Sequence, residues 1–107
     1  MFYSKKFKKF SNIKHCFFSR RGGFSKGIYR SLNCGKGSKD NKKNVNRNLS
    51  LVSKKMKINE KKLSLMYQTH SNKVIIINKK NKNSKKFNSD ALITKIKDVA
   101  LGVVTAD

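Results

Sequence analysis

The chain has 107 residues, of which 36% are hydrophobic, and a formal net charge of +22 from 27 basic and five acidic residues. Its length suits one domain, but its apolar fraction is low for a globular protein, so we expect a thin or incomplete core. No apolar run approaches the ~18 residues of a membrane-spanning helix, and the N-terminal segment lacks the apolar stretch of a secretory signal. We therefore expect no membrane association and a cytoplasmic protein.

The basic residues are mostly lysine, with 23 Lys against four Arg. Nucleic-acid sites favour Arg, because its guanidinium makes bidentate contacts with bases and phosphates. The abundance of Lys, Asn and Ile resembles the composition that a very AT-rich genome produces. Residues 1–88 carry a charge of +23 and residues 89–107 a charge of −1. A nucleic-acid partner is therefore not our main expectation, although a small basic RNA-binding protein remains the alternative.

The N-terminal third contains little regular patterning. Residues 1–14 form a lead-in rich in Lys and Phe, and residues 15–20 resemble a short strand. Residues 21–27 form a glycine-rich loop, and residues 28–35 continue irregularly. Paired glycines allow the backbone to approach an anion closely, so this segment could be an anion-binding loop. An ordinary turn with basic neighbours would have the same sequence features.

A helix is predicted after Asp40, which can cap its first turn. Four apolar residues then recur at steps of four, three and four, which places them on one helical face. They are Val45, Leu49, Val52 and Met56.

Four strand-like runs follow the helix. Residues 62–70 and 73–79 are separated by a short polar connection and suggest a hairpin, and residues 90–95 and 99–106 end the chain. Alternation within these runs predicts one core with the helix packed against it. The predicted strand residues of this core are Leu63, Leu65, Val74, Ile76, Leu92, Val99, Leu101 and Val103.

Few side chains are candidates for a catalytic or metal-binding role when each is considered separately. His70 follows a strand, where a histidine can bind a metal or accept a proton, but a lone histidine is also a common surface residue. Cys16 and Cys34 form no CxxC pair, and we expect both to be free thiols with a structural role. The chain shows no complete set of catalytic groups.

Several segments taken in order resemble the laccase-domain family, also called polyphenol oxidase-like, now regarded as zinc-dependent purine nucleoside phosphorylases. The resemblance runs from about residue 15 to Asp107 and rests on five motifs in the family's order. Ser19 replaces the usual Thr, Cys34 the usual Leu, and Ser71 a common Gly. The motifs are HCFFSRRGGFSKGIYRSLNCG, KDNKKNVNRNLSLV, YQTHSNKVIII, SDALIT and ALGVVTAD.

The resemblance implies an α+β fold with a mixed β-sheet sandwich flanked by helices. It implies that residues 15–107 are the N-terminal half of the family domain, that residues 1–14 are a lead-in, and that the fold is incomplete because the C-terminal half is absent. In the family, a metal-binding Cys follows the Thr-Ala-Asp motif and a metal-binding His lies further along. The remaining ligands would therefore lie beyond Asp107.

The implied activity is phosphorolysis of adenosine, inosine, guanosine or methylthioadenosine, together with adenosine deamination. His70 would bind zinc, or copper as another metal that the resemblance allows. The implied partners are a purine nucleoside and phosphate. A chain with one of three zinc ligands is expected to be inactive alone. Residues that would line the substrate pocket are Arg20, Gly22, Gly23, Asn33 and Gln68, the last expected to share a strand face with His70.

Overall fold

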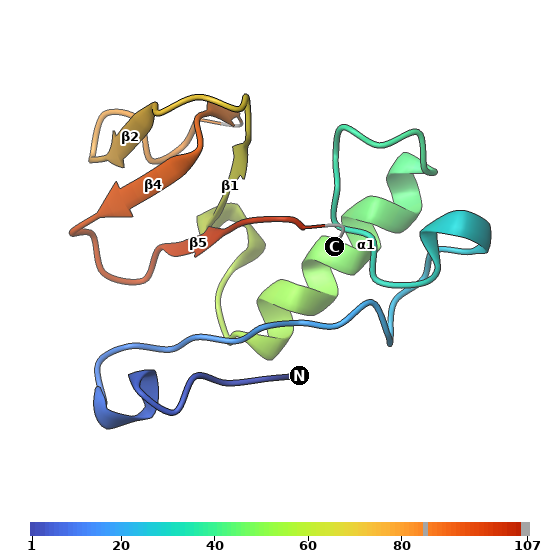
Figure 1. Ribbon diagram of the computed structural model, residues 1–107, viewed down its shortest axis with the longest axis horizontal. Helices are drawn as coiled ribbons and strands as arrows, with labels where there is room; N and C mark the ends of the chain where they lie inside the picture. Colours follow the sequence, from blue (N-terminus) through green and yellow to red (C-terminus); the bar gives the residue numbers. More distant parts are fainter. Residues whose placement is uncertain (85, 106–107) are drawn as a thin grey trace. The chain divides into compact units, whose positions relative to one another are not determined.

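The computed structural model describes residues 1–84 and 86–105 of the chain (Figure 1). The described residues form one α-helix, three short 3₁₀ helices and five strands. They fall into two compact units, Met1–Lys57 and Ile58–Asp107. No helix in the described ranges is long and apolar enough to cross a membrane.

The N-terminal segment of the first unit contains one 3₁₀ turn at Phe7–Lys9 and a further turn closed by the Ile13 N–H, which donates to the Phe10 carbonyl at 3.3 Å. Phe2 and Phe17 form an antiparallel bridge whose two backbone hydrogen bonds are both 2.8 Å long. The imidazole of His15 accepts a hydrogen bond from the backbone N–H of Ser4 at 2.6 Å. The strand expected over residues 15–20 is therefore limited to a single bridge.

Helix α1 spans Lys42–Lys55 and confirms the predicted helical face. Val45 and Leu49 are buried, and Val52 is half-buried. The expected cap is wrong by one residue: the side chain of Asn41 accepts from the backbone N–H of Lys43 at 2.9 Å. Asp40 is displaced from that role because its carboxylate is held by hydrogen bonds from a neighbouring loop.

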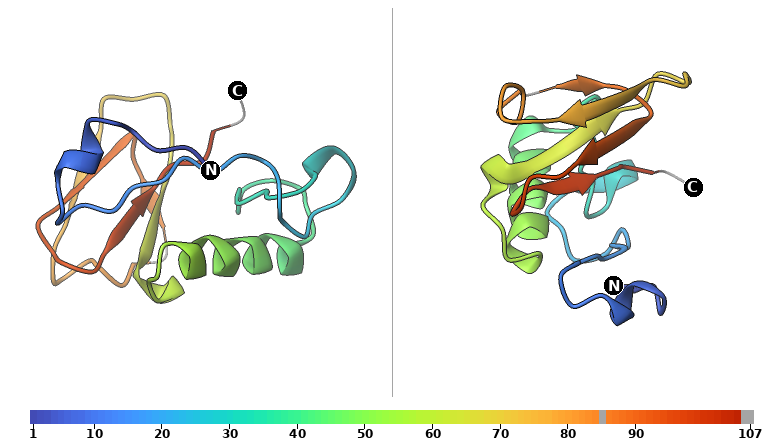
Figure 2. Two further views of the ribbon diagram at one scale, coloured as in Figure 1. Left: turned by 90° about the horizontal axis from the view of Figure 1, so that it is seen from below. Right: turned by 90° about the vertical axis from the view of Figure 1, so that its left-hand side faces the viewer.

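The second unit contains the five strands, whose pairings are all parallel. Strand β1 (Leu63–Tyr67) lies between β3 (Phe87–Asn88) and β5 (Ala100–Gly102). Strand β2 (Val74–Ile77) pairs with β4 (Ala91–Thr94) in a separate two-stranded sheet (Figure 2). One helix together with these short sheets confirms the α+β class.

The expected hairpin between residues 62–70 and 73–79 is wrong. β1 and β2 belong to different sheets, and each pairs with a strand that follows later in the chain. The short polar connection is in fact the middle of a longer non-strand segment, residues 68–73. Parallel partners cannot be joined by a tight turn, so sequence neighbours are not sheet neighbours here.

The strand core is smaller than predicted. Ile77, Phe87 and Leu92 are buried together, with Met66, Ile75 and Ile96 packed against them. The predicted alternation has the wrong parity in β2, because four consecutive apolar residues do not show which face is buried. Several predicted core residues are instead exposed, namely Val74 (50%), Ile76 (62%), Leu101 (40%) and Val103 (50%).

Candidate functional site

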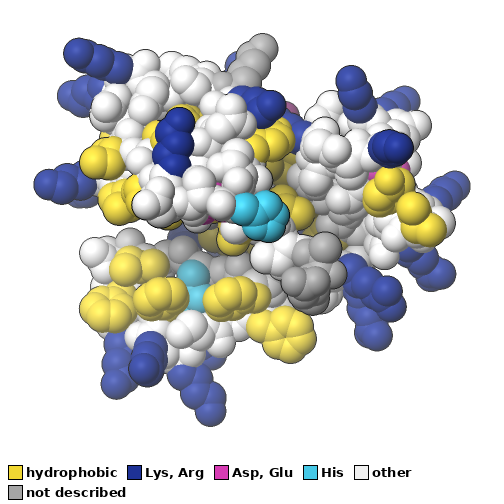
Figure 3. Space-filling view, turned by 45° about the horizontal axis from the view of Figure 1, so that its top comes forward, with side chains coloured by type: hydrophobic (Ala, Val, Ile, Leu, Met, Phe, Trp, Pro, Cys, Tyr) yellow, Lys and Arg dark blue, Asp and Glu magenta, His cyan; other side chains and the backbone are white. Residues whose placement is uncertain are grey.

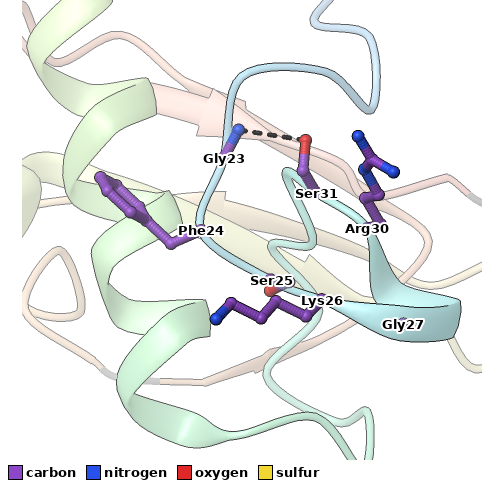
Figure 4. Close-up of a pocket in the computed structure, with 7 residues that line it drawn as sticks. All are labelled: Gly23, Phe24, Ser25, Lys26, Gly27, Arg30 and Ser31. Carbon is purple, nitrogen blue, oxygen red and sulfur yellow. Dashed lines mark hydrogen bonds between the residues drawn. The ribbon is translucent and has the colours of Figure 1, made fainter.

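The glycine-rich loop of the first unit is folded back on itself. The backbone carbonyl of Arg20 accepts from the N–H groups of Ser31 at 3.0 Å and Leu32 at 2.7 Å. The backbone N–H of Gly23 donates to the Ser31 hydroxyl at 3.2 Å (Figure 4). A Cβ at Gly23 would lie 2.2 Å from the carbonyl oxygen of Ser31, so only glycine permits this approach. Gly22 has φ +89°, in the region that also favours glycine.

Asn48 on α1 fastens this loop to the helix. Its side chain is completely buried. Its Oδ1 accepts from the backbone N–H of Phe24 at 2.7 Å. Its Nδ2 donates to the Ser25 hydroxyl at 2.9 Å and to the Asn33 carbonyl at 2.8 Å. One buried amide thus satisfies polar groups from three positions of the loop.

Asp40 and Asn33 complete the same network. The Ser25 hydroxyl and the Asn33 amide both donate to the Asp40 carboxylate, which lowers the pKa of Asp40, the Ser25 contact most strongly. Asn33 Nδ2 also donates to the Ser38 hydroxyl, and its Oδ1 accepts from the Gly35 N–H. The Asn33 side chain therefore holds the loop in shape, and its substrate-binding role stays a prediction.

An open cavity of about 470 Å³ lies against the loop. Phe24 lies on its edge, with the guanidinium of Arg47 stacked 3.8 Å from the ring centroid. The cationic side chains of Lys26 and Arg30 extend in different directions (Figure 4), so they do not converge on one point. The residues lining the cavity are Gly23, Phe24, Ser25, Lys26, Gly27, Arg30 and Ser31.

His70 lies in a tight turn of the second unit, after the end of β1. Its backbone has φ +55°, which is left-handed, and its side chain is exposed. β1 ends at Tyr67, so the strand alternation that would place Gln68 and His70 on one face does not extend to these two residues. Within the described residues, the imidazole makes no hydrogen bond to the protein.

The carboxylate of Asp90 holds this turn. It accepts from the Ser71 N–H at 2.8 Å and the Ser71 hydroxyl at 2.7 Å. It also accepts from the N–H of His70 at 3.2 Å and from the N–H and hydroxyl of Thr69 at 3.4 and 3.2 Å. The Ser71 and Thr69 hydrogen bonds lower the pKa of Asp90 to about 2.

The predicted site residues are divided between the two units. Arg20, Gly22, Gly23 and Asn33 belong to the first, and Gln68 and His70 to the second. Their meeting in one pocket stays a prediction.

Two residues that organise these segments, Asn48 and Asp90, were missed. Both residues lie inside matching motifs, Asn48 in KDNKKNVNRNLSLV and Asp90 as the second residue of SDALIT, and this membership is the signal that could have identified them. The first motif contains several other Asn residues, so the motif alone does not single out Asn48.

The described residues contain no cluster of three or more His, Cys, Asp or Glu side chains able to hold a metal ion. Cys16 and Cys34 are free thiols, as predicted, and both are half-buried. Burial raises the pKa of the Cys34 thiol to about 11, which disfavours a thiolate ligand. The face in Figure 3 carries many Lys and Arg side chains, scattered rather than gathered around one hollow.

Comparisons with known proteins agree on one family. Residues 14–107 match the family model described as multi-copper polyphenol oxidoreductase laccase. The chain is 32% identical over 105 residues to a protein of Bacteroides thetaiotaomicron named purine nucleoside phosphorylase. That alignment covers 92% of this chain but 39% of the relative, so the chain spans well under half of the relative's length.

Two solved structures share the fold. The Bacillus licheniformis hypothetical protein YfiH superposes with a TM-score of 0.73 at 23% identity, covering 82% of this chain and 36% of that one. The Neisseria meningitidis protein NMB0706, of family DUF152, superposes with a TM-score of 0.70 at 33% identity, covering 82% of this chain and 34% of that one. The aligned part of this chain thus corresponds to about a third of the length of each of those chains.

Proposed function

The chain belongs to the multi-copper polyphenol oxidoreductase laccase family, and we propose that it carries part of the machinery of a purine nucleoside phosphorylase. The observation that carries the proposal is the 32% identity to a relative bearing that name. In the proposed reaction, a phosphate oxygen forms a bond to C1′ of the nucleoside while the bond from C1′ to the purine nitrogen breaks. The products are the 1-phosphate of the sugar and the free purine, which takes up a proton that phosphate or solvent supplies. The sugar product is ribose 1-phosphate from adenosine, inosine or guanosine and 5-methylthioribose 1-phosphate from methylthioadenosine.

The proposed substrates are adenosine, inosine, guanosine and methylthioadenosine. A second proposed activity is adenosine deamination, in which water adds to C6 of the purine and ammonia leaves. The loop containing Arg20, Gly22 and Gly23 supports the phosphate part of this proposal, because an exposed guanidinium beside two residues without a Cβ suits an anion. Gln68 and Asn33 are proposed as further substrate contacts.

His70 is proposed as a ligand of zinc or of copper. Its exposed, unpaired imidazole is compatible with this role. The other described residues do not fit such a metal, because they supply no group of three ligating side chains. No step of the reaction is therefore derived through a metal, and the 107 residues alone are proposed to be inactive.

The test uses the chain alone and a chimera that joins residues 1–107 to the remaining part of the Bacteroides relative. Release of adenine from adenosine that depends on inorganic phosphate is followed by chromatography, and inosine formation reports deamination. We expect activity in the chimera alone. His70→Ala should abolish it, whereas Asn72→Ala, a change at an exposed neighbour, should leave it within about twofold.

Two outcomes would contradict the proposal. Activity of the short chain that survives in His70→Ala would show that the expected site is not used. A folded chimera without activity, together with RNA binding by the short chain that weakens steeply with salt, would favour the basic RNA-binding alternative instead.

A further inference from the structure

The Asp90 carboxylate is the meeting point of three successive residues. Its two oxygens accept five hydrogen bonds from Thr69, His70 and Ser71. Asp90 is itself fixed by its backbone N–H, which donates to the carbonyl of Lys73 at 3.0 Å. The acceptor is therefore attached to the far side of the same turn, directly before β4.

This contact holds His70 in an unusual conformation. A left-handed backbone is disfavoured for a residue with a Cβ, so the turn needs interactions that offset it. Asp90 supplies an acceptor to the His70 N–H and to the N–H groups on either side of it. The imidazole takes no part in these bonds and stays exposed. The backbone is thus fixed while the ring is left available.

We propose that Asp90 is the positioning residue of His70: its carboxylate fixes the Thr69–Ser71 turn and with it the direction in which the Cα–Cβ bond of His70 leaves the backbone. The catalytic meaning of this arrangement rests on the proposed function, but the arrangement itself does not. If Asp90 had only a structural role, its hydrogen bonds would instead stabilise the pairing of β2 with β4, which begins next to this turn at Val74 and Ala91.

The experiment compares Asp90→Asn with Asp98→Asn in the complete 107-residue chain by nuclear magnetic resonance. Asp98 lies in the same unit and is exposed, so its substitution removes the same charge without touching the Thr69–Ser71 turn. Measured quantities are amide hydrogen exchange of residues 69–71 and of β2, and the rotamer populations of the His70 side chain from its Hα–Hβ couplings.

In Asp90→Asn, we expect the amides of residues 69–71 to exchange about tenfold faster or more, and the His70 rotamer populations to change, because the rotamers that a side chain can adopt depend on its backbone angles. The β2 amides should stay within about twofold of the parent chain, and Asp98→Asn should change neither segment. Ser71→Ala removes one hydroxyl donor without changing charge and should produce the same effect in smaller degree. It provides the measurement if Asp90→Asn fails to fold.

Two results would overturn the proposal. One is unchanged exchange and rotamer populations at residues 69–71 in both Asp90→Asn and Ser71→Ala. The other is a uniform acceleration across β2 with the His70 rotamers unchanged, which would assign Asp90 to strand pairing alone. Neither readout depends on enzymatic activity, so a failure of the phosphorylase proposal would be recognised separately.

Discussion

The side-chain nitrogen of Asn48 lies 2.8 Å from the backbone carbonyl oxygen of Asn33, joining the middle of α1 to the segment that follows the glycine-rich loop. The same amide also forms hydrogen bonds with Phe24 and Ser25 inside that loop. Because this loop is not part of a β-sheet, strand pairing does not supply hydrogen-bond partners for its backbone groups. The helix therefore supplies a polar side chain on its buried face, where an apolar residue would otherwise be expected.

Asn48→Ala should lower the free energy of unfolding by about 2–4 kcal/mol, because it leaves the Phe24 N–H and the Asn33 carbonyl without this partner and removes the hydrogen bond that the Ser25 hydroxyl accepts. Urea unfolding followed by circular dichroism measures this loss. Asn46→Ala, on the exposed side of the same helix, should change the stability by about 0.5 kcal/mol or less. Equal losses in the two variants would contradict the role given to Asn48.

Gly23→Ala should destabilise the first unit by about 2–3 kcal/mol, since the new methyl group would meet the Ser31 carbonyl and the backbone of Leu32. Gly37→Ala is the matched control, because no atom lies within 4 Å of the position its Cβ would take. It should be neutral or slightly stabilising. The free energies of unfolding of the two variants provide the comparison, and a tolerated Gly23→Ala would show that the loop adopts a wider path.

Local pattern was sufficient to predict the helix but not the sheets. The spacing of Val45 and Leu49 follows the helical period, so it predicted both the helix and its buried face. The run Val74–Ile77 has no polar residue to mark its exposed side, and its partner β4 follows later in the chain. Parallel pairing depends on contacts between distant segments, which alternation within one strand does not encode.

The candidate site was predictable only in part, and for a related reason. His70 and the glycine loop were identified by motif order. The groups that hold them, Asn48 and Asp90, act through side-chain hydrogen bonds to residues 15 or more positions away in the sequence. Hydrogen-bond partners this far apart in the sequence follow no fixed spacing, so a local pattern cannot identify them. The local capping rule predicts Asp40 as the cap of the nearest helix, but its carboxylate instead accepts a hydrogen bond from the hydroxyl of Ser25, 15 residues away.

Stability at low pH should depend on Asp40. Its pKa lies below the ordinary value of 3.8 because Ser25 and Asn33 donate to the carboxylate, so the ionised form favours the folded state. This contribution is complete above the ordinary pKa and is lost as pH falls through the lowered one. Ser25→Ala should move the pKa of Asp40 upward, measured by carbon-13 titration of the carboxyl group.

Ser11→Ala, at an exposed position, is the control and should leave the Asp40 titration unchanged. The stability difference between the parent chain and Ser25→Ala should also shrink as the solution is made more acidic. An Asp40 pKa that is the same in the parent chain and in Ser25→Ala would show that the hydroxyl does not stabilise the charge.

Cys34 should react slowly with alkylating reagents in the folded chain. Burial raises the pKa of its thiol from 9.0 to about 11. The thiolate is the reacting form, so near pH 8 its population should be about 100-fold smaller than for the unshifted thiol.

The measurement uses Cys16→Ser, which leaves Cys34 as the single cysteine, and follows iodoacetamide labelling by mass spectrometry. The labelling rate should increase by a similar factor when urea unfolds the chain. The folded-state rate should also keep rising with pH well beyond pH 9, since the thiol is not yet fully ionised there. A labelling rate equal in folded and unfolded chains would instead place the Cys34 thiol in water, which would contradict its role as a partly buried, unreactive filler of the loop.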